Sequence, residues 1–210
     1  MPPYREHDIT LASFEQIDRE IGDHTFTEAE YALVRRVIHT SADFEFKQLV
    51  QFKHGPFPAA AKALGVKSPI VTDVSMVAAG IKTVVAKTWG SPIAIAVKQQ
   101  QPSASAVLET RSAYGMRQCA HRYPKAIFAV GNAPTALLAL CESIEKGDCQ
   151  PALVIGAPVG FVNVVESKQA LSALQVPHIV VTGRKGGSAI AAAMLNALMI
   201  QAWETSTLPN

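Results

Sequence analysis

Five short apolar runs, each about the length of a strand, alternate with helical stretches over most of this 210-residue chain. The runs are rich in Val and Ile and are continuous rather than alternating with polar residues, which is typical of parallel strands covered on both faces. Strands and helices that alternate in this way predict a doubly wound α/β domain. The runs are 69–74 (PIVTDV), 92–97 (PIAIAV), 126–131 (AIFAVG), 152–157 (ALVIGA) and 178–183 (HIVVTG).

Helices are expected between these strands and before the first of them. Two N-terminal stretches carry apolar residues at helical spacing, and the second opens with a capping-box pattern, Thr27 followed by Glu30. We therefore expect one domain over 1–210, a flavodoxin-like three-layer α/β/α fold with a mainly parallel five-stranded sheet and N-terminal helices. The expected helices are at about 10–21, 26–39, 75–87, 103–118, 134–146, 164–175 and 187–203.

The composition excludes several classes of protein. Apolar residues make up 49% of the chain and charged residues 17%, which fits a globular domain with a substantial core. A net charge of +2 is too balanced for a general binder of nucleic acid or membrane surfaces. Neither a signal peptide nor a membrane-spanning run is expected. Three cysteines without a C-x-x-C spacing (Cys119, Cys141 and Cys149) fit free thiols in the cytoplasm better than a disulfide framework or a zinc site.

Glycine-containing loops follow three of the predicted strands. Ligands of open parallel sheets bind beyond the carboxyl ends of the strands, and glycine there lets the backbone approach a ligand closely. We therefore predict a ligand site along this edge, although ordinary turn chemistry explains any one loop equally well. The loops begin GNAPTAL, GAPVGFVNVVESK and GRKGGSAI, and the residues expected to contact the ligand are Gly131, Asn132, Gly186 and Gly187.

Two arginines are candidates for binding an anionic ligand. Arg111 and Arg184 each offer a guanidinium fork that suits a carboxylate or a phosphate. The alternatives are a surface ion pair for Arg111 and a solvated basic turn for Arg184 and Lys185. The spacings of the common nucleotide-binding glycine motifs are missing, so no nucleotide site is predicted. Asp73, at the end of the first predicted strand, is expected to cap the helix that follows it.

His39 stands at the end of the second predicted helix. A lone histidine in such a place is more often structural than catalytic, and its spacing alone does not decide between the two. The helix C-terminus favours the imidazolium, whereas Arg35 and Arg36 oppose it. The other histidines are interpreted as packing or solvent-facing residues: His7, His24, His54, His121 and His178.

Taken together and in order, seven segments resemble the precorrin-8X methylmutases, also called cobalt-precorrin-8 methylmutases. The resemblance covers roughly residues 9–200. It implies an isomerase of cobalamin biosynthesis that moves a methyl group from C-11 to C-12, giving hydrogenobyrinate or, with cobalt, cobyrinate. It also implies a homodimer with active sites near the subunit interface. The segments are SFEQIDRE, VIHTSADF, PIVTDVSMVAAGI, TRSAYG, VGNAPTAL, GAPVGFVNVVESKQAL and VTGRKGGSAIAAAMLNAL.

The same resemblance assigns roles to individual residues. It implies that His39 is the catalytic acid/base and that Ser13 and Arg111 contact the substrate. Family members often have glycine where this chain has Ala42. A methyl shift within one molecule needs no external donor and no redox cofactor, so no cofactor and no metal site is expected, while the substrate itself can carry cobalt. Histidine suits this chemistry because its pKa lies near physiological pH.

Met76, Val77 and Phe161 are expected to face the flat macrocycle of the corrinoid substrate. A non-catalytic tetrapyrrole carrier and a flavodoxin-like enzyme acting on a phosphorylated metabolite are the alternative functions. Turnover of the corrinoid separates the first of these from an isomerase, and the choice of ligand separates the second.

Overall fold

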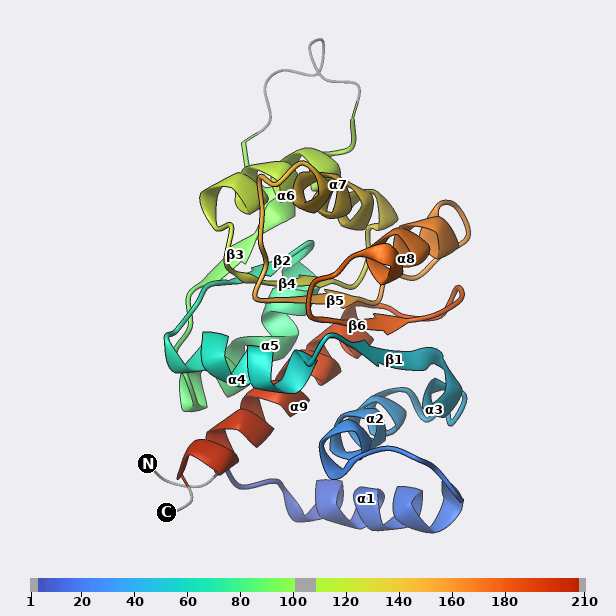
Figure 1. Cartoon of the computed structure of the whole chain (residues 1–210). Helices are drawn as coiled ribbons and strands as arrows, with labels where there is room; N and C mark the ends of the chain where they lie inside the picture. The colour runs from blue at the N-terminus through green and yellow to red at the C-terminus, as the bar shows by residue number, and fades with distance from the viewer. Residues whose placement is uncertain (1–3, 101–108, 208–210) are drawn as a thin grey trace.

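The chain folds around one mixed β-sheet that lies between layers of helices (Figure 1). The computed structural model describes residues 4–100 and 109–207. The strands are β1 (Val50–Lys53), β2 (Ile70–Thr72), β3 (Ile93–Ile95), β4 (Ile127–Val130), β5 (Leu153–Gly156) and β6 (His178–Val181). The helices are α1 (Asp8–Glu20), α2 (Glu28–Ser41), α3 (Phe46–Leu49), α4 (Pro56–Gly65), α5 (Ser75–Lys87), η1 (Ala96–Lys98, a 3₁₀ turn), α6 (Arg111–Arg122), α7 (Pro134–Glu145), α8 (Val164–Ala173) and α9 (Ser188–Thr207).

The sheet order is β1-β6-β5-β4-β2-β3. Strands β2 to β6 pair in parallel, which confirms the predicted α/β class, and β1 pairs antiparallel with β6. The predicted count of five strands is wrong because β1 adds a sixth along the edge of β6. In β1 only Val50 is buried, while Gln51 and Lys53 are exposed, so this edge strand has no continuous apolar run that would reveal it.

Helices cover both faces of the sheet, as Figure 1 shows. On one face α6, α7 and α8 pack on residues such as Phe128 and Val154 of the central strands. On the other face α5 and α9 pack on the sheet, α2 and α4 pack on α9, and α1 lies outermost against α2. Helix α9 is therefore the central helix of its layer, which explains why apolar residues surround nearly its whole circumference.

Two parts of the helix prediction differ from the structure. Helix α6 begins at Arg111, where the Thr110 hydroxyl accepts a hydrogen bond from the Ala113 amide at 3.2 Å. Of the predicted helix at 103–118, residues 111–118 lie in α6, residues 109 and 110 precede it, and residues 103–108 lie outside the described residues. The short helix α3, the 3₁₀ turn η1 and helix α4 were not predicted, although Pro56 in the first turn of α4 is typical of a helix start.

None of the helices within the described ranges is both long enough and apolar enough to cross a membrane.

The strand order indicates where a ligand site is expected in the fold. Strand β3 lies on one side of β2, whereas β4, β5 and β6 follow in turn on the other side. The direction of winding therefore reverses between β2 and β4. In doubly wound sheets, ligands bind outside the carboxyl ends of the strands at such a point. The segments after β2 and β4 contain Asp73 and Gly131, respectively.

Candidate active site

Asp73 organises the point where the sheet reverses its winding. Its buried carboxylate accepts hydrogen bonds from the amides of Gly131 (3.1 Å), Asn132 (2.7 Å) and Ala133 (2.8 Å). Burial raises the pKa of the Asp73 carboxyl, although these amide hydrogen bonds act in the opposite direction. Asp73 thus holds the turn between β4 and α7 and caps neither α7 nor α5, the helix after its own strand, so the prediction that it caps the following helix is wrong.

These hydrogen bonds to Asp73 change what the first glycine loop can offer a ligand. The amides of Gly131 and Asn132 already donate to Asp73, so the exposed Asn132 side chain is the polar group left for a substrate. A Cβ atom at Gly131 would lie 2.8 Å from Cα of Ser188 and 3.0 Å from Val77. Glycine is therefore required here by the close approach of α9 to the end of β4.

The other two glycine loops pack against each other, also at the carboxyl ends of the strands. The Gly187 amide donates to the Ala157 carbonyl at 2.8 Å, and the Gly160 amide donates to the Arg184 carbonyl at 3.3 Å. Gly186 has φ +154°, and a Cβ atom there would lie 2.3 Å from the Ala157 oxygen. The structure thus brings the three predicted loops together at the carboxyl ends of the strands. Glycine is required at 186 because this loop packs closely on the loop after β5.

His39 lies in the last turn of α2 with its side chain exposed. Its imidazole meets the ring of Phe14 on α1 edge to face, with the ring centroids 5.4 Å apart. Ser13 is the neighbour of Phe14 in α1, and its hydroxyl donates to the Ile9 carbonyl at 2.8 Å. The packing of α1 on α2 therefore brings the segments that carry Ser13 and His39 together.

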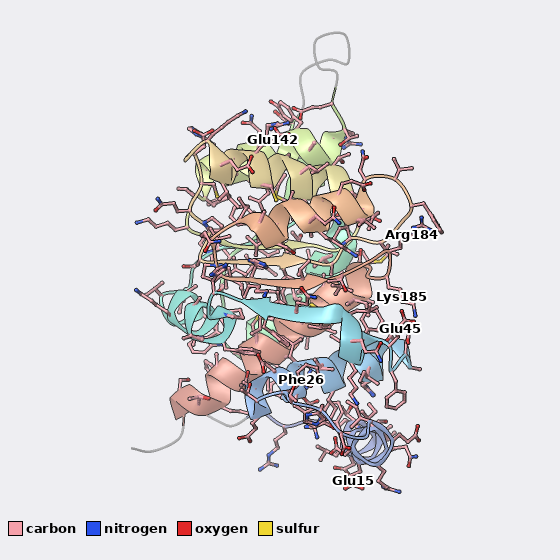
Figure 2. The ribbon with its side chains drawn as sticks, turned by 45° about the vertical axis from the view of Figure 1, so that its right-hand side comes forward. Glu15, Phe26, Glu45, Glu142, Arg184 and Lys185 are labelled. Atoms are coloured by element: carbon pink, nitrogen blue, oxygen red, sulfur yellow. The ribbon has the colours of Figure 1, made fainter. Side chains whose placement is uncertain are left out.

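Lys185 joins the end of α2 to the loop after β6. Its ammonium lies 2.6 Å from Oδ2 of Asp43 and 2.6 Å from Oε2 of Glu45, both just beyond the end of α2 (Figure 2). The hydrogen bond from Lys185 lowers the pKa of the Asp43 carboxyl. These ion pairs place His39 near the carboxyl edge of the sheet, and they also engage Lys185, so it is not a free cation for a ligand.

Arg184 remains available beside Lys185. Its side chain is exposed, and its guanidinium lies 5.7 Å from the ring centroid of Phe161 in the loop after β5. Phe161 is 85% exposed, and three further exposed apolar residues lie on the same edge: Met76, Val159 and Val162. The carboxyl ends of the strands therefore combine the cation of Arg184 with an apolar surface. Val77, which was expected to face a ligand, is fully buried in the core instead.

Arg111 is not brought to His39 within one chain. It opens α6 near the β3 edge of the sheet, and its guanidinium donates to the Val97 carbonyl at 3.3 Å. His39 lies near the carboxyl end of β6, which is next to the edge strand β1. Four strand spacings separate β6 from β3 in the sheet, or roughly 19 Å at about 4.8 Å each.

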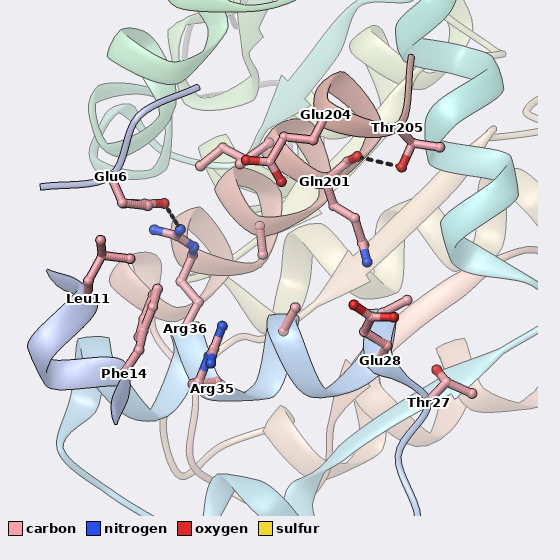
Figure 3. A pocket seen from close by; sticks show the side chains of 14 residues that line it. Glu6, Leu11, Phe14, Thr27, Glu28, Arg35, Arg36, Gln201, Glu204 and Thr205 are labelled. Atoms are coloured by element: carbon pink, nitrogen blue, oxygen red, sulfur yellow. Dashed lines mark hydrogen bonds and ion pairs between the residues drawn. The ribbon is translucent and has the colours of Figure 1, made fainter. Parts of the chain in front are cut away.

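A cavity of about 720 Å³ lies elsewhere, between α1, α2 and the C-terminal half of α9 (Figure 3). None of the predicted site residues lines it. Phe14, whose ring contacts His39, does, and so do Arg36 and Glu6, which form an ion pair across it. Among the described residues, no group of three or more His, Cys, Asp and Glu side chains is arranged to hold a metal ion.

The sequence profile of the precorrin-8X methylmutases matches residues 8–201. The chain belongs to the precorrin-8X methylmutase family. A cobalt-precorrin-8 methylmutase of Synechocystis sp. is 43% identical to it, over 94% of this chain and 97% of that protein. The cobalt-precorrin-8 methylmutase of Priestia megaterium is 42% identical, over 90% of this chain and 85% of that protein.

A solved structure gives the same result. The crystal structure of precorrin-8x methyl mutase from Thermus thermophilus matches with a TM-score of 0.87 at 40% identity, covering 96% of this chain and 98% of that one. Membership of the precorrin-8X methylmutase family makes this protein an isomerase, a methyl mutase of cobalamin biosynthesis.

One buried charged residue near the carboxyl ends of the strands, Lys168, was not predicted from the sequence. Lys168 on α8 is 2% exposed, and its ammonium donates to the carbonyls of Gly183 and Lys185 at 2.7 Å each. The sequence pattern does indicate the position of Lys168, because Val164, Lys168 and Leu171 stand at i, i+4 and i+7 and so share one face of the helix. That face is buried, which places a charged group beneath the loop after β6.

Proposed function

We propose that this methylmutase moves the methyl group at C-11 of precorrin-8X, or of its cobalt form, to C-12, with His39 as the acid/base. The bond between C-11 and the methyl carbon breaks while the bond to C-12 forms, so the product is an isomer of the substrate. The reaction therefore consumes no methyl donor, oxidant or reductant. The observation that carries the proposal is the exposed imidazole of His39 in the last turn of α2, close to the point where the ion pairs of Lys185 join the segment after α2 to the loop after β6.

Histidine suits the proton movements that such a shift requires. Protonation of the conjugated macrocycle at the right position favours the rearranged tautomer, and an imidazole takes up and releases a proton near neutral pH. The edge-to-face contact with Phe14 supports this role because it limits the orientations that the imidazole can adopt.

The remaining side chains of this edge suit a large, flat ligand with many carboxylates. Arg184 and the Asn132 side chain are exposed there and can bind carboxylate groups, as can Arg111 farther along the sheet. Phe161 and Met76 offer apolar surface for the face of the ring. Ser13, Gly186 and Gly187 complete the set of residues that we propose for substrate binding.

We also propose that the protein acts as a homodimer in the cytoplasm. The exposed apolar residues at the sheet edge support the dimer, because such patches are often covered by a partner. The cysteines support a reducing compartment: Cys119, Cys141 and Cys149 are unpaired and buried, and burial raises the pKa of the Cys141 thiol to about 12. The order of the five parallel strands supports grouping the fold with flavodoxin-like domains.

The test is turnover of precorrin-8X and of cobalt-precorrin-8, followed in the visible spectrum because the shift changes the conjugated system. We expect His39→Ala to fold normally and to lose about 100-fold or more of kcat, the usual contribution of general acid–base catalysis. His121→Ala, at an exposed position in the last turn of α6, is the matched control and should keep wild-type turnover.

The outcomes separate the alternatives. Turnover by His39→Ala at the wild-type rate would show that His39 is not the acid/base. Tight binding of the corrinoid by the wild-type protein without conversion would instead indicate a carrier. The relative rates with the two substrates decide whether the natural one carries cobalt.

A further inference from the structure

Lys168 is a buried charged residue that the proposed reaction does not use. It projects from the buried face of α8 between Val164 and Leu171, and only 2% of its surface is exposed. Burying an ammonium group is costly unless hydrogen bonds replace its water. An apolar side chain of similar length would fill the same space without that cost. The role of Lys168 therefore depends on the groups that its ammonium contacts.

The contacts of Lys168 are backbone carbonyls of one short loop. The ammonium donates to the Gly183 and Lys185 carbonyls, at 2.7 Å each. The carbonyl between them, that of Arg184, accepts a hydrogen bond from the Gly160 amide at 3.3 Å. Three successive carbonyls of the loop thus accept hydrogen bonds, two from Lys168 and one from Gly160, while the side chain of Arg184 is exposed (Figure 2).

The chemistry of an ammonium group suits this task. It has three donors and no acceptor, so one side chain can hold two carbonyls at once. Hydrogen bonds from a charged donor are roughly twice as strong as those between neutral groups. Burial lowers the pKa of Lys168 to about 8, so the group is still mainly protonated at neutral pH.

We propose that Lys168 is a positioning residue, which holds the loop Gly183–Lys185 so that Arg184 faces the substrate and Lys185 reaches Asp43. The inference rests on the proposed function, in which Arg184 binds a carboxylate of the substrate. It also connects α8 to the catalytic segment, because the ion pair between Lys185 and Asp43 lies four residues beyond His39 in the sequence.

The experiment compares Lys168→Met, which keeps the length and removes the donors, with Lys146→Met at an exposed position beyond α7. Two readouts are used, steady-state turnover of precorrin-8X and limited digestion with trypsin followed by mass spectrometry. Trypsin cleaves after Arg184 and Lys185, so cleavage at these two bonds reports directly on the loop.

We expect Lys168→Met to raise KM on the order of tenfold, the effect of losing one hydrogen bond to a charged group, while kcat changes much less. In an Arg184→Ala background the same substitution should change KM little, because both changes remove the same interaction. Cleavage after Arg184 and Lys185 should accelerate in Lys168→Met, with other sites unaffected, and Lys146→Met should match the wild type in both readouts.

Other outcomes would overturn the inference. An unchanged KM and unchanged cleavage in a wild type that does convert precorrin-8X would show that Lys168 does not position the loop. If Lys168→Met fails to fold, Lys168→Gln, which keeps an NH2 donor group without the charge, takes its place, and failure of both would assign Lys168 to global stability instead. A wild type that does not convert the substrate contradicts the proposed function, whereas the cleavage pattern still tests the loop.

Discussion

At the scale of single residues, Ala42 shows how α2 ends after His39. It adopts the left-handed conformation, with φ 53° and ψ 30°, and its amide donates to the Ile38 carbonyl at 2.7 Å. A side chain is strained in this region, and glycine is the usual residue at such a helix end. The chain thus forms with alanine the turn that glycine would form more easily, so glycine is not needed at position 42 to end α2 after His39.

The first prediction follows from this strain. We expect Ala42→Gly to increase the free energy of unfolding by about 0.5–1 kcal/mol, because glycine has no Cβ to strain there. Ala79→Gly, at an exposed position inside α5, should decrease it by about 0.5–1 kcal/mol. Urea unfolding measures both. A loss of stability in Ala42→Gly would mean that the turn is not strained.

His178 gives a prediction for the effect of pH on stability. Its Nδ1 lies 2.8 Å from the Val176 carbonyl, and its buried Nε2 has no partner among the described residues. Burial lowers the pKa of His178, an effect to which nearby His54 and Lys53 add, whereas the Val176 carbonyl opposes it. The unfolded chain therefore binds a proton below about pH 6.5 that the folded chain does not, and stability falls as the pH drops below that value.

We expect this loss of stability between pH 7 and pH 5 to be smaller in His178→Phe, which cannot take up the proton. Thermal unfolding across this range measures the effect. His121→Phe, which changes an exposed histidine, should keep the wild-type pH dependence. Identical pH profiles for His178→Phe and the wild type would show that another group is responsible.

At the scale of helices and strands, close packing decides which glycines are required. A Cβ atom at Gly115 of α6 would lie 1.9 Å from the Ala96 carbonyl oxygen of η1. Backbone cannot move aside as a flexible side chain can. We expect Gly115→Ala to destabilise the protein by about 1–3 kcal/mol, as overpacking does.

Gly65 is the matched control for this prediction. It ends α4, and a Cβ atom there meets no atom within 4 Å. Gly65→Ala should stabilise the protein by about 0.4–1 kcal/mol through the lower entropy of the unfolded chain. Opposite signs for the two substitutions in urea unfolding would confirm the difference in packing, and equal effects would contradict it.

The sequence predicts those elements that are buried on both sides. Strands β4, β5 and β6 are buried along their whole length and appear as continuous apolar runs. Strand β1 has only one covered face and was not predicted. The glycine loops could be placed at one edge because parallel strands end together. Contacts between distant segments could not be predicted, since Asp73 and Asn132 are 59 residues apart and Asp43 and Lys185 are 142 apart.

At the scale of the whole molecule, the separation of Arg111 from His39 bears on the assembly. The two lie near opposite edges of one sheet, while Phe161 and Val162, 85% and 77% exposed, lie on the loop between β5 and α8. A second copy that covers this loop would bury the apolar side chains and enclose the substrate. The dimer proposed above thus accounts for exposed apolar surface that a monomer would leave in water.

The dimer can be tested by placing a charge on that loop. We expect Val162→Asp to shift the protein from dimer to monomer in sedimentation, because an unpaired carboxylate in an apolar interface is costly. Val66→Asp is the control, since Val66 is 74% exposed but lies at the end of α4, before β2 and far from the carboxyl edge. If Val162→Asp remains dimeric and Val66→Asp dissociates, the interface lies at the opposite end of the sheet, and the substrate site is then contained in one chain.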